Sequence, residues 1–195
     1  MRVSVTLLDS FNSFTNGDIT ESQLIDRITH EFVGNFYTER GSAFHTAIEN
    51  GTDTEGDFQF KGIEKVMKEV ENYKQNGIAE LKNTKHYFID GEDIELVGKA
   101  DYWTPSSICE LKTTTYFDVN TYLSSIQWRC YMSIFDVKEV VYVVATLDLE
   151  NAVRDVNILT LLYYDEINSE IKKLLMLFLD YIKRRGLYEY LASSN

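Results

Sequence analysis

A change in the spacing of hydrophobic residues near Gly77 constrains the fold of this chain more than any other feature of its sequence. Before Gly77, apolar residues recur every three or four positions, as Leu24 and Ile28 do, which is typical of amphipathic helices. After it, residues 78–89 and 94–103 alternate apolar with polar side chains, which is typical of half-buried strands. The spacing therefore predicts helices followed by a sheet, which is an α/β arrangement.

The individual elements can be placed from this spacing and from the turn residues. Helices are expected over residues 4–14, 20–33, 38–50, 62–76, 119–135 and 165–192, and strands over residues 78–89, 94–103, 107–113, 139–147 and 153–164. Asp90-Gly91 between two strand-like runs is a strong hairpin signal. Residues 140–144 form the most apolar run, which predicts a central strand that is buried on both faces.

Together these elements predict one domain with a mixed central sheet and flanking helices. A mainly helical part is expected over residues 1–77, a sheet core over residues 78–164 and a C-terminal helix over residues 165–195. The length of 195 residues suits a single packed core.

Composition excludes several classes of protein. A hydrophobic content of 44% with 13% aromatic residues argues against a disordered chain. Cys109 and Cys130 are too few for a four-cysteine zinc or iron–sulfur site, and we expect two buried, reduced thiols in a cytoplasmic protein. No apolar run reaches the ~18–20 residues of a membrane span, and residues 1–10 do not resemble a secretory signal.

The charge of the chain is strongly negative. It has 31 acidic and 19 basic residues, which gives a formal net charge of −12. This balance argues against indiscriminate electrostatic binding to nucleic acid, but it leaves room for a local basic groove.

Asp101, Glu110 and Lys112 form the pattern with the most chemical content. Glu110 and Lys112 lie two residues apart on an expected strand, so their side chains should point to the same face. Asp101 lies near the end of the preceding strand and can reach the same place if the two strands form a hairpin. Two carboxylates beside a lysine suit a hard divalent cation, Mg²⁺ or Mn²⁺, next to an amine that activates water. The carbonyl of Leu111 could supply a further oxygen ligand.

The acid-x-lysine spacing also arises by chance. It occurs four times in this chain, beginning at Glu80, Glu110, Asp136 and Glu170. Only the pair at Glu110 lies inside an apolar, strand-like run with a carboxylate on the neighbouring strand. On this motif alone, a catalytic arrangement and a chance one are equally supported.

Two further pairs extend the pattern. His45 and Glu49 lie one turn apart on an expected helix, which is usual for a surface pair but also suits metal binding, because imidazole is a ligand for Mn²⁺. Gln127 and Tyr131 lie one turn apart on the helix after Glu110, beside its apolar stripe. An amide in that position needs a polar partner, either nearby on the surface or in the site itself.

In this order the motifs resemble those of the PD-(D/E)XK nuclease superfamily and, within it, the RecB-like exonuclease branch. The resemblance covers roughly residues 40–147. It rests on Gly41-x-x-x-His45, Gly98-x-x-Asp101, Glu110-x-Lys112 and Gln127-x-x-x-Tyr131, on the expected helix, strand, strand and helix. Ala100 stands where the superfamily's namesake proline is found, and the branch often lacks that proline.

The resemblance implies a restriction-endonuclease-like αβββαβ core that hydrolyses DNA phosphodiesters, as an exonuclease in recombination, repair or processing. The metal ligands it implies for Mg²⁺ or Mn²⁺ are His45, Asp101, Glu110 and the carbonyl of Leu111. Lys112 would orient or deprotonate the attacking water, and Gln127 and Tyr131 would support the substrate or the site. The cluster-binding cysteines of some relatives are absent, so no iron–sulfur cluster is implied.

The resemblance implies DNA, single- or double-stranded, as the partner. It leaves open whether the protein forms a homo-oligomer or binds a helicase or recombinase. Basic residues near the C-terminus, Lys172, Lys173 and residues 183–185, are candidates to bind its phosphates, together with Lys61 and Lys65. We expect these residues to line one side of the cleft.

Two other functions compete with a nuclease. The first is a catalytically inactive acidic interaction module, which would bind a basic partner or mimic DNA. The second is a nuclease fold that binds nucleic acid without cutting it. A nuclease needs His45, Asp101 and Glu110 to converge, whereas a DNA mimic needs only acidic residues on its surface.

Overall fold

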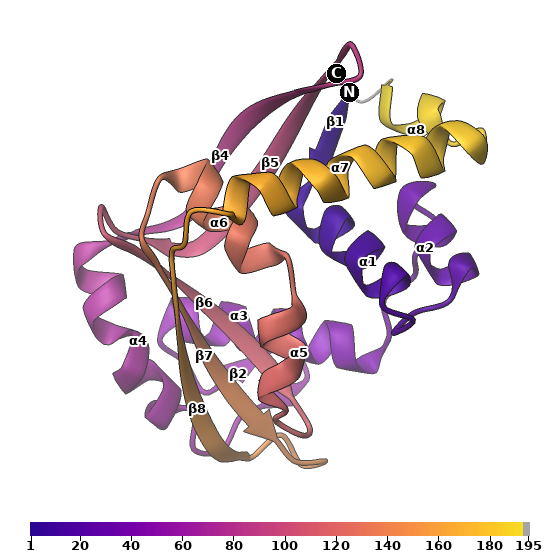
Figure 1. Ribbon diagram of the computed structural model, residues 1–195. Helices are drawn as coiled ribbons and strands as arrows, with labels where there is room; N and C mark the ends of the chain where they lie inside the picture. Colours follow the sequence, from indigo (N-terminus) through magenta and orange to yellow (C-terminus); the bar gives the residue numbers. More distant parts are fainter. Residues whose placement is uncertain (193–195) are drawn as a thin grey trace.

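In the computed structural model, which describes residues 1–192, a mixed sheet lies between two layers of helices (Figure 1). The sheet of this described part has six strands, β1 (Arg2–Ser4), β4 (Ile78–Ile89), β5 (Glu92–Trp103), β6 (Ser107–Thr114), β7 (Glu139–Leu147) and β8 (Val153–Leu162). β2 (Thr54–Glu55) and β3 (Phe58–Gln59) pair separately. The α/β class with a mixed central sheet, flanking helices and a C-terminal helix is confirmed.

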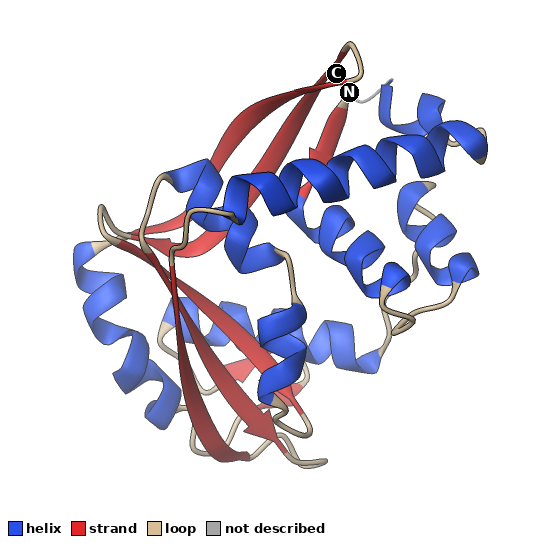
Figure 2. Ribbon diagram, in the orientation of Figure 1, coloured by secondary structure: helices blue, strands red, loops and turns tan. Residues whose placement is uncertain are grey.

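Helices cover both faces of the sheet (Figure 2). They are α1 (Val5–Thr15), α2 (Glu21–Ile28), α3 (Phe36–Asn50), α4 (Glu64–Asn76), α5 (Val119–Ser124), α6 (Gln127–Phe135), α7 (Ile167–Arg184) and α8 (Tyr188–Ala192). Local signals fix several ends. A reciprocal capping box between Thr20 and Gln23 begins α2, and Gly51, with a left-handed φ of 69°, ends α3.

The β4–β5 hairpin predicted from Asp90-Gly91 is confirmed. Ile89 pairs with Glu92 across a two-residue loop, so the two strands run antiparallel along their length. Asp90 and Gly91 have φ values of 50° and 80°, which is the left-handed geometry that a type I′ hairpin turn requires.

One edge of β5 is shared by two strands, and this divides the sheet. β1 runs parallel to the first half of β5, where Val3 pairs with Leu96, and β6 runs antiparallel to its end, where Tyr102 pairs with Cys109. The backbone of residues 98–101 lies between these two pairings, and we call this segment the split of the sheet. The split is where polar side chains from other elements can approach β5.

Two hydrophobic clusters hold the layers together. The larger one joins α1, α2, α6 and α7 to one face of the sheet, and includes Leu8, Leu96 and Phe178. The smaller one joins α3 and α4 to the other face of β6 and β7, and includes Phe44 and Val143. β7 lies between the clusters and is buried along nearly its whole length, as its apolar sequence predicts.

The structure differs from the expected elements where tertiary contacts decide the backbone. β1 was not expected, because three residues give no periodicity and its pairing depends on β5. The helix expected over 119–135 is two helices, because Ser125 is extended and the Asp9 carboxylate accepts hydrogen bonds from the Ser125 hydroxyl and the Ile126 amide.

Two helix ends and the content of the N-terminal part also differ from the expected elements. Gly186, with a φ of 69°, separates α7 from α8 in the helix expected over 165–192. The helix expected over 20–33 ends at Ile28, shortly before His30, whose φ is also positive. The N-terminal part up to residue 77 also contains β1 and the short β2–β3 pair. Within residues 1–192, no helix is both long enough and apolar enough to cross a membrane.

Candidate active site

Glu110 and Lys112 lie together on β6 beside the split, on the face that α6 covers. The Lys112 Nζ is 3.0 Å from the Glu110 Oε1, and the Glu110 side chain is almost fully buried. The same-face placement expected from their spacing therefore holds. A buried carboxylate needs several polar partners, and α6 supplies them.

Gln127 and Tyr131 are the partners from α6. The Gln127 Nε2 donates to the Glu110 Oε1 at 3.2 Å and to the Tyr131 hydroxyl at 3.0 Å. The Tyr131 hydroxyl donates to the carbonyl of Lys99 at 2.8 Å and lies 3.3 Å from the Glu110 Oε1. Tyr131 therefore joins the split in β5 to the carboxylate on β6, and the pair expected beside the apolar stripe does reach the Glu110 site.

Gly98 explains how α6 comes this close. A Cβ atom at this position would lie 3.2 Å from the side chains of Ile134 and Phe135 and 3.3 Å from that of Tyr131. The absence of a side chain thus lets α6 pack directly on β5. In the Gly98-x-x-Asp101 motif, the glycine makes room for the helix that supports Glu110.

Asp101 and His45 approach from the other side. The His45 Nδ1, on α3, is 3.6 Å from the Asp101 Oδ2, on β5. The same Asp101 oxygen accepts a 2.7 Å hydrogen bond from the Leu111 amide, and the Asp101 amide faces the Glu110 Oε2 at 3.4 Å. These contacts bring residues from α3, β5, β6 and α6 into one connected cluster.

A small cavity lies on the His45 side of this cluster. Its volume is about 20 Å³, enough for a single water molecule, and its lining residues are His45, Glu49, Ala79, Glu80, Asp101, Tyr102 and Leu111. Glu49 was noted beside His45 but was not among the expected ligands, and Glu80 was not expected at the site. The helical spacing of Glu49 from His45 was a signal for the first, whereas Glu80 depends on the pairing of β4 with β5, where Leu81 lies opposite Ala100.

The charged groups of this cluster shift one another's pKa values. Burial raises the pKa of Glu110 to about 7, against the opposing effect of the Lys112 charge, and the negative charge of Asp101 adds to the rise. Burial also opposes ionisation of Asp101, but the contact with His45 and the Lys112 charge hold its pKa below the ordinary value. Burial disfavours the Lys112 ammonium, but the two carboxylates outweigh this effect and raise its pKa.

The donors around the small cavity suit a divalent cation in part. Two ligands that are each ~2.1 Å from one ion can be at most about 4.2 Å apart, and the His45 and Asp101 atoms meet this condition. Among residues 1–192, however, no three or more His, Cys, Asp or Glu side chains surround one point as a metal site. The Glu110 Oε1 is directed to Lys112 and Gln127 instead. The full ligand set of His45, Asp101, Glu110 and Leu111 remains a prediction.

Several of the basic residues expected to line the cleft form contacts with other parts of the chain. Lys183, on α7, pairs with Glu92, and Arg185, directly after α7, pairs with Glu21. Lys173 lines a surface pocket with Asn12 and Arg129. Binding of phosphates by Lys172 and Lys173 stays a prediction that these positions do not test.

Lys61 and Lys65 lie near the start of β8. Lys61 pairs with Glu150, and the Lys65 Nζ donates to the Val153 carbonyl at 3.4 Å. Their described contacts are therefore with the β7–β8 connection and β8 rather than with the residues around Glu110.

Comparisons with known proteins show a fold that this chain shares with a solved structure, but they identify no family. No family model matches the chain, and no curated protein matches it. Among solved structures, the chain is similar to SSO0001, with a TM-score of 0.54 and 15% identity over 91% of this chain and 76% of that one. At this identity the likeness shows the fold alone.

Two further solved structures align over most of the chain with lower scores. One is a phage-related exonuclease from Haemophilus somnus 129PT, with a TM-score of 0.48 and 13% identity over 89% of this chain and 90% of that one. The other is Scheffersomyces stipitis Rai1, with a TM-score of 0.39 and 14% identity over 94% of this chain and 61% of that one. TM-scores this low do not establish a common fold.

Proposed function

We propose that this protein is a divalent-metal-dependent DNA nuclease of the PD-(D/E)XK type, in its RecB-like branch, and that it acts as an exonuclease. The observation that carries the proposal is the cluster of Asp101, Glu110 and Lys112 at the split of the sheet. His45 contacts it from α3, and Gln127 and Tyr131 contact it from α6. A surface-charge mimic of DNA has no need for such a buried, hydrogen-bonded arrangement.

The residues of the cluster would divide the work of hydrolysis. The raised pKa of Lys112 keeps its amine charged at neutral pH, so the ammonium orients the attacking water and offsets charge on the phosphate. Gln127 and Tyr131 hold Glu110 in place, and His45 holds Asp101. A divalent ion bound by His45, Asp101, Glu110 and the Leu111 carbonyl would stabilise the phosphate charge and activate water.

Substitution of Lys112 separates binding of the ion from chemistry. Lys112→Ala should abolish cleavage but leave Mn²⁺ affinity largely intact, because the amine is not a ligand. Asp101→Ala should abolish both. Cleavage of linear and circular DNA with Mg²⁺, Mn²⁺ or chelator, together with calorimetry with Mn²⁺, measures the two properties.

Lys68→Ala is the matched control for this test. Lys68 is an exposed lysine on α4, on the other side of the sheet from α6, and its removal changes the net charge equally. It should leave cleavage and Mn²⁺ affinity as they are. Full activity of Lys112→Ala would mean that the lysine role is wrong, and absence of cleavage by the unaltered protein with either ion would favour an interaction module. Resistance of circular DNA separates an exonuclease from an endonuclease.

A further inference from the structure

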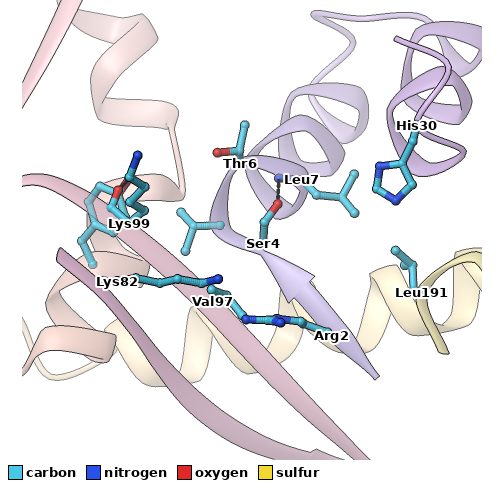
Figure 3. Close-up of a pocket in the computed structure, with 11 residues that line it drawn as sticks. Arg2, Ser4, Thr6, Leu7, His30, Lys82, Val97, Lys99 and Leu191 are labelled. Atoms are coloured by element: carbon cyan, nitrogen blue, oxygen red, sulfur yellow. Dashed lines mark hydrogen bonds between the residues drawn. The ribbon is translucent and has the colours of Figure 1, made fainter. Parts of the chain in front are cut away.

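A cationic groove runs along the first turn of α1, beside the proposed active site. It consists of two adjoining pockets of about 370 and 360 Å³, which share Ser4, Thr6, Leu7 and His30 in their linings. Figure 3 shows the larger pocket, with Lys82 and Lys99 on one side, His30 on the other and the first turn of α1 between them. Each volume falls within the range of roughly 300–1,000 Å³ that is usual for ligand sites.

The lining of the groove has the opposite sign to the rest of the chain. Arg2, Lys82 and Lys99 line the larger pocket and Arg27 lines the smaller one, and no lining residue of either pocket in the described chain is Asp or Glu. A net charge of −12 makes such a concentration of positive charge unusual. A concave basic surface attracts anions, because field lines are concentrated there.

Two of these cations are available for a ligand. Arg2 pairs with Glu95, and Lys99 pairs with Glu80. Among residues 1–192, neither Lys82 nor Arg27 is paired with a carboxylate, and the Arg27 Nη1 donates to the Ser10 hydroxyl. Because an unpaired cation in a groove is not already neutralised, it can neutralise a phosphate.

The groove also has surfaces on which a base can lie. Phe32 lines the smaller pocket with 46% of its surface exposed, and the Arg27 guanidinium lies 5.0 Å from the centre of its ring. Val97 and Leu191 add apolar walls to the larger pocket. Aromatic side chains interleaved with cations suit an unpaired strand, because the bases of a duplex are stacked inside it.

The groove borders the active site at two points. Tyr131 lines the larger pocket, and its hydroxyl lies 3.3 Å from the Glu110 Oε1. Lys99 lines the same pocket, and its partner Glu80 lines the small cavity that contains His45 and Asp101. A strand lying in the groove would therefore have its next phosphates beside the proposed site of hydrolysis.

We propose that this groove binds single-stranded nucleic acid, with phosphates at Lys82 and Arg27 and a base against Phe32, and feeds the strand to the Glu110 site. The inference rests on the proposed nuclease function in one respect, namely that the groove leads the strand to a site of hydrolysis. The binding itself does not require cleavage, so the two can fail separately.

Fluorescence anisotropy with an oligothymidine of about 15 nucleotides tests the groove. Each single-strand phosphate contact changes the slope of log K against log salt by about 0.7, so loss of one contact should weaken binding about five-fold at ~0.1 M salt. Lys82→Ala should show this loss and a slope shallower by about 0.7, and Lys82→Glu a larger loss. Measurements with Ca²⁺ and with chelator should give the same fold-change, because Lys82 is not among the ligands proposed for the ion.

Lys68→Ala is the matched control again, and Phe32→Ala tests stacking. Lys68→Ala should leave affinity unchanged, while Phe32→Ala should weaken binding without changing the salt slope. If Lys82→Ala and Lys68→Ala lose equal affinity for the oligothymidine, or if Lys82→Glu loses none, the groove does not bind the strand. If a duplex of the same length binds more tightly than the oligothymidine and is weakened equally by Lys82→Ala, the single-strand assignment is wrong.

A cleavage assay on the same variants keeps the two proposals apart. Cleavage by the unaltered protein with unchanged binding by Lys82→Glu rejects the groove and leaves the nuclease. Binding that depends on Lys82 without any cleavage rejects the nuclease and leaves a single-strand-binding groove.

Discussion

Glu110 has unusual surroundings, because its carboxyl group is buried beside both a lysine and a second carboxylate. Its pKa of about 7 lies above the ordinary value of 4.5, so between these values the folded protein holds a proton that the unfolded chain has lost. The free energy of unfolding should therefore fall as pH rises from about 4.5 to about 7. Lys112, whose pKa is raised, stays charged throughout that range and does not contribute to the change.

Glu110→Gln removes this titration. The free energy of unfolding of the variant should therefore rise, relative to that of the unaltered protein, as pH rises. In chelator, the difference in melting temperature between variant and unaltered protein should grow by several degrees from about pH 5 to about pH 8. Each pKa unit corresponds to about 1.36 kcal/mol, and 1 kcal/mol shifts the melting temperature of a domain of this size by roughly 2–4 °C. Thermal melts of both proteins at a series of pH values measure this difference. A constant difference would show that Glu110 titrates normally.

At the scale of elements, the start of α6 positions half of the site. Asp9, on α1, accepts hydrogen bonds from the Ser125 hydroxyl at 2.8 Å and the Ile126 amide at 2.9 Å, directly before Gln127. A carboxylate from a neighbouring helix thus holds the helix end that carries Gln127 and Tyr131. This contact also interrupts the helix that the sequence pattern predicts over 119–135.

Asp9→Ala should destabilise the protein and lower cleavage together. It leaves the Ile126 amide without its partner, which costs about 1–3 kcal/mol, and lets Gln127 move relative to Glu110. Asp18→Ala, which removes an exposed carboxylate just after α1, is the control with the same charge change. Denaturant unfolding and a cleavage assay measure the two effects. Equal behaviour of both variants would show that Asp9 does not position α6.

At the scale of the whole molecule, the acidic surface limits how DNA can bind. Because few cations line the groove and the net charge is −12, few phosphates can be neutralised. The salt dependence should therefore be shallow, at about −0.7 per single-strand phosphate contact. Binding should instead depend strongly on the divalent ion. A salt series with Ca²⁺ and then with chelator measures both, and a steep slope without metal dependence would contradict this account.

Local periodicity and turn chemistry were enough to predict several parts of this protein from its amino-acid sequence. The alternation of residues 78–103 around Asp90-Gly91 predicted the β4–β5 hairpin, and the apolar run at 140–144 predicted the buried strand β7. The spacing of Glu110 and Lys112 placed both on one face of β6, because side chains alternate along a strand. Such features need only neighbours in the chain.

Features that join distant segments of the chain could not be predicted, because they depend on how the elements pack in space. The split of the sheet requires β1 and β6 to share one edge of β5, and no local pattern in residues 2–4 reveals that. Glu80 reaches the small cavity through strand pairing, and Lys82 reaches the groove because α1 packs beside β5. The groove is basic because the fold gathers cations from β1, α2, β4 and β5 into one concave surface. Charge counted along the sequence could not show this, since electrostatic fields depend on distances in space.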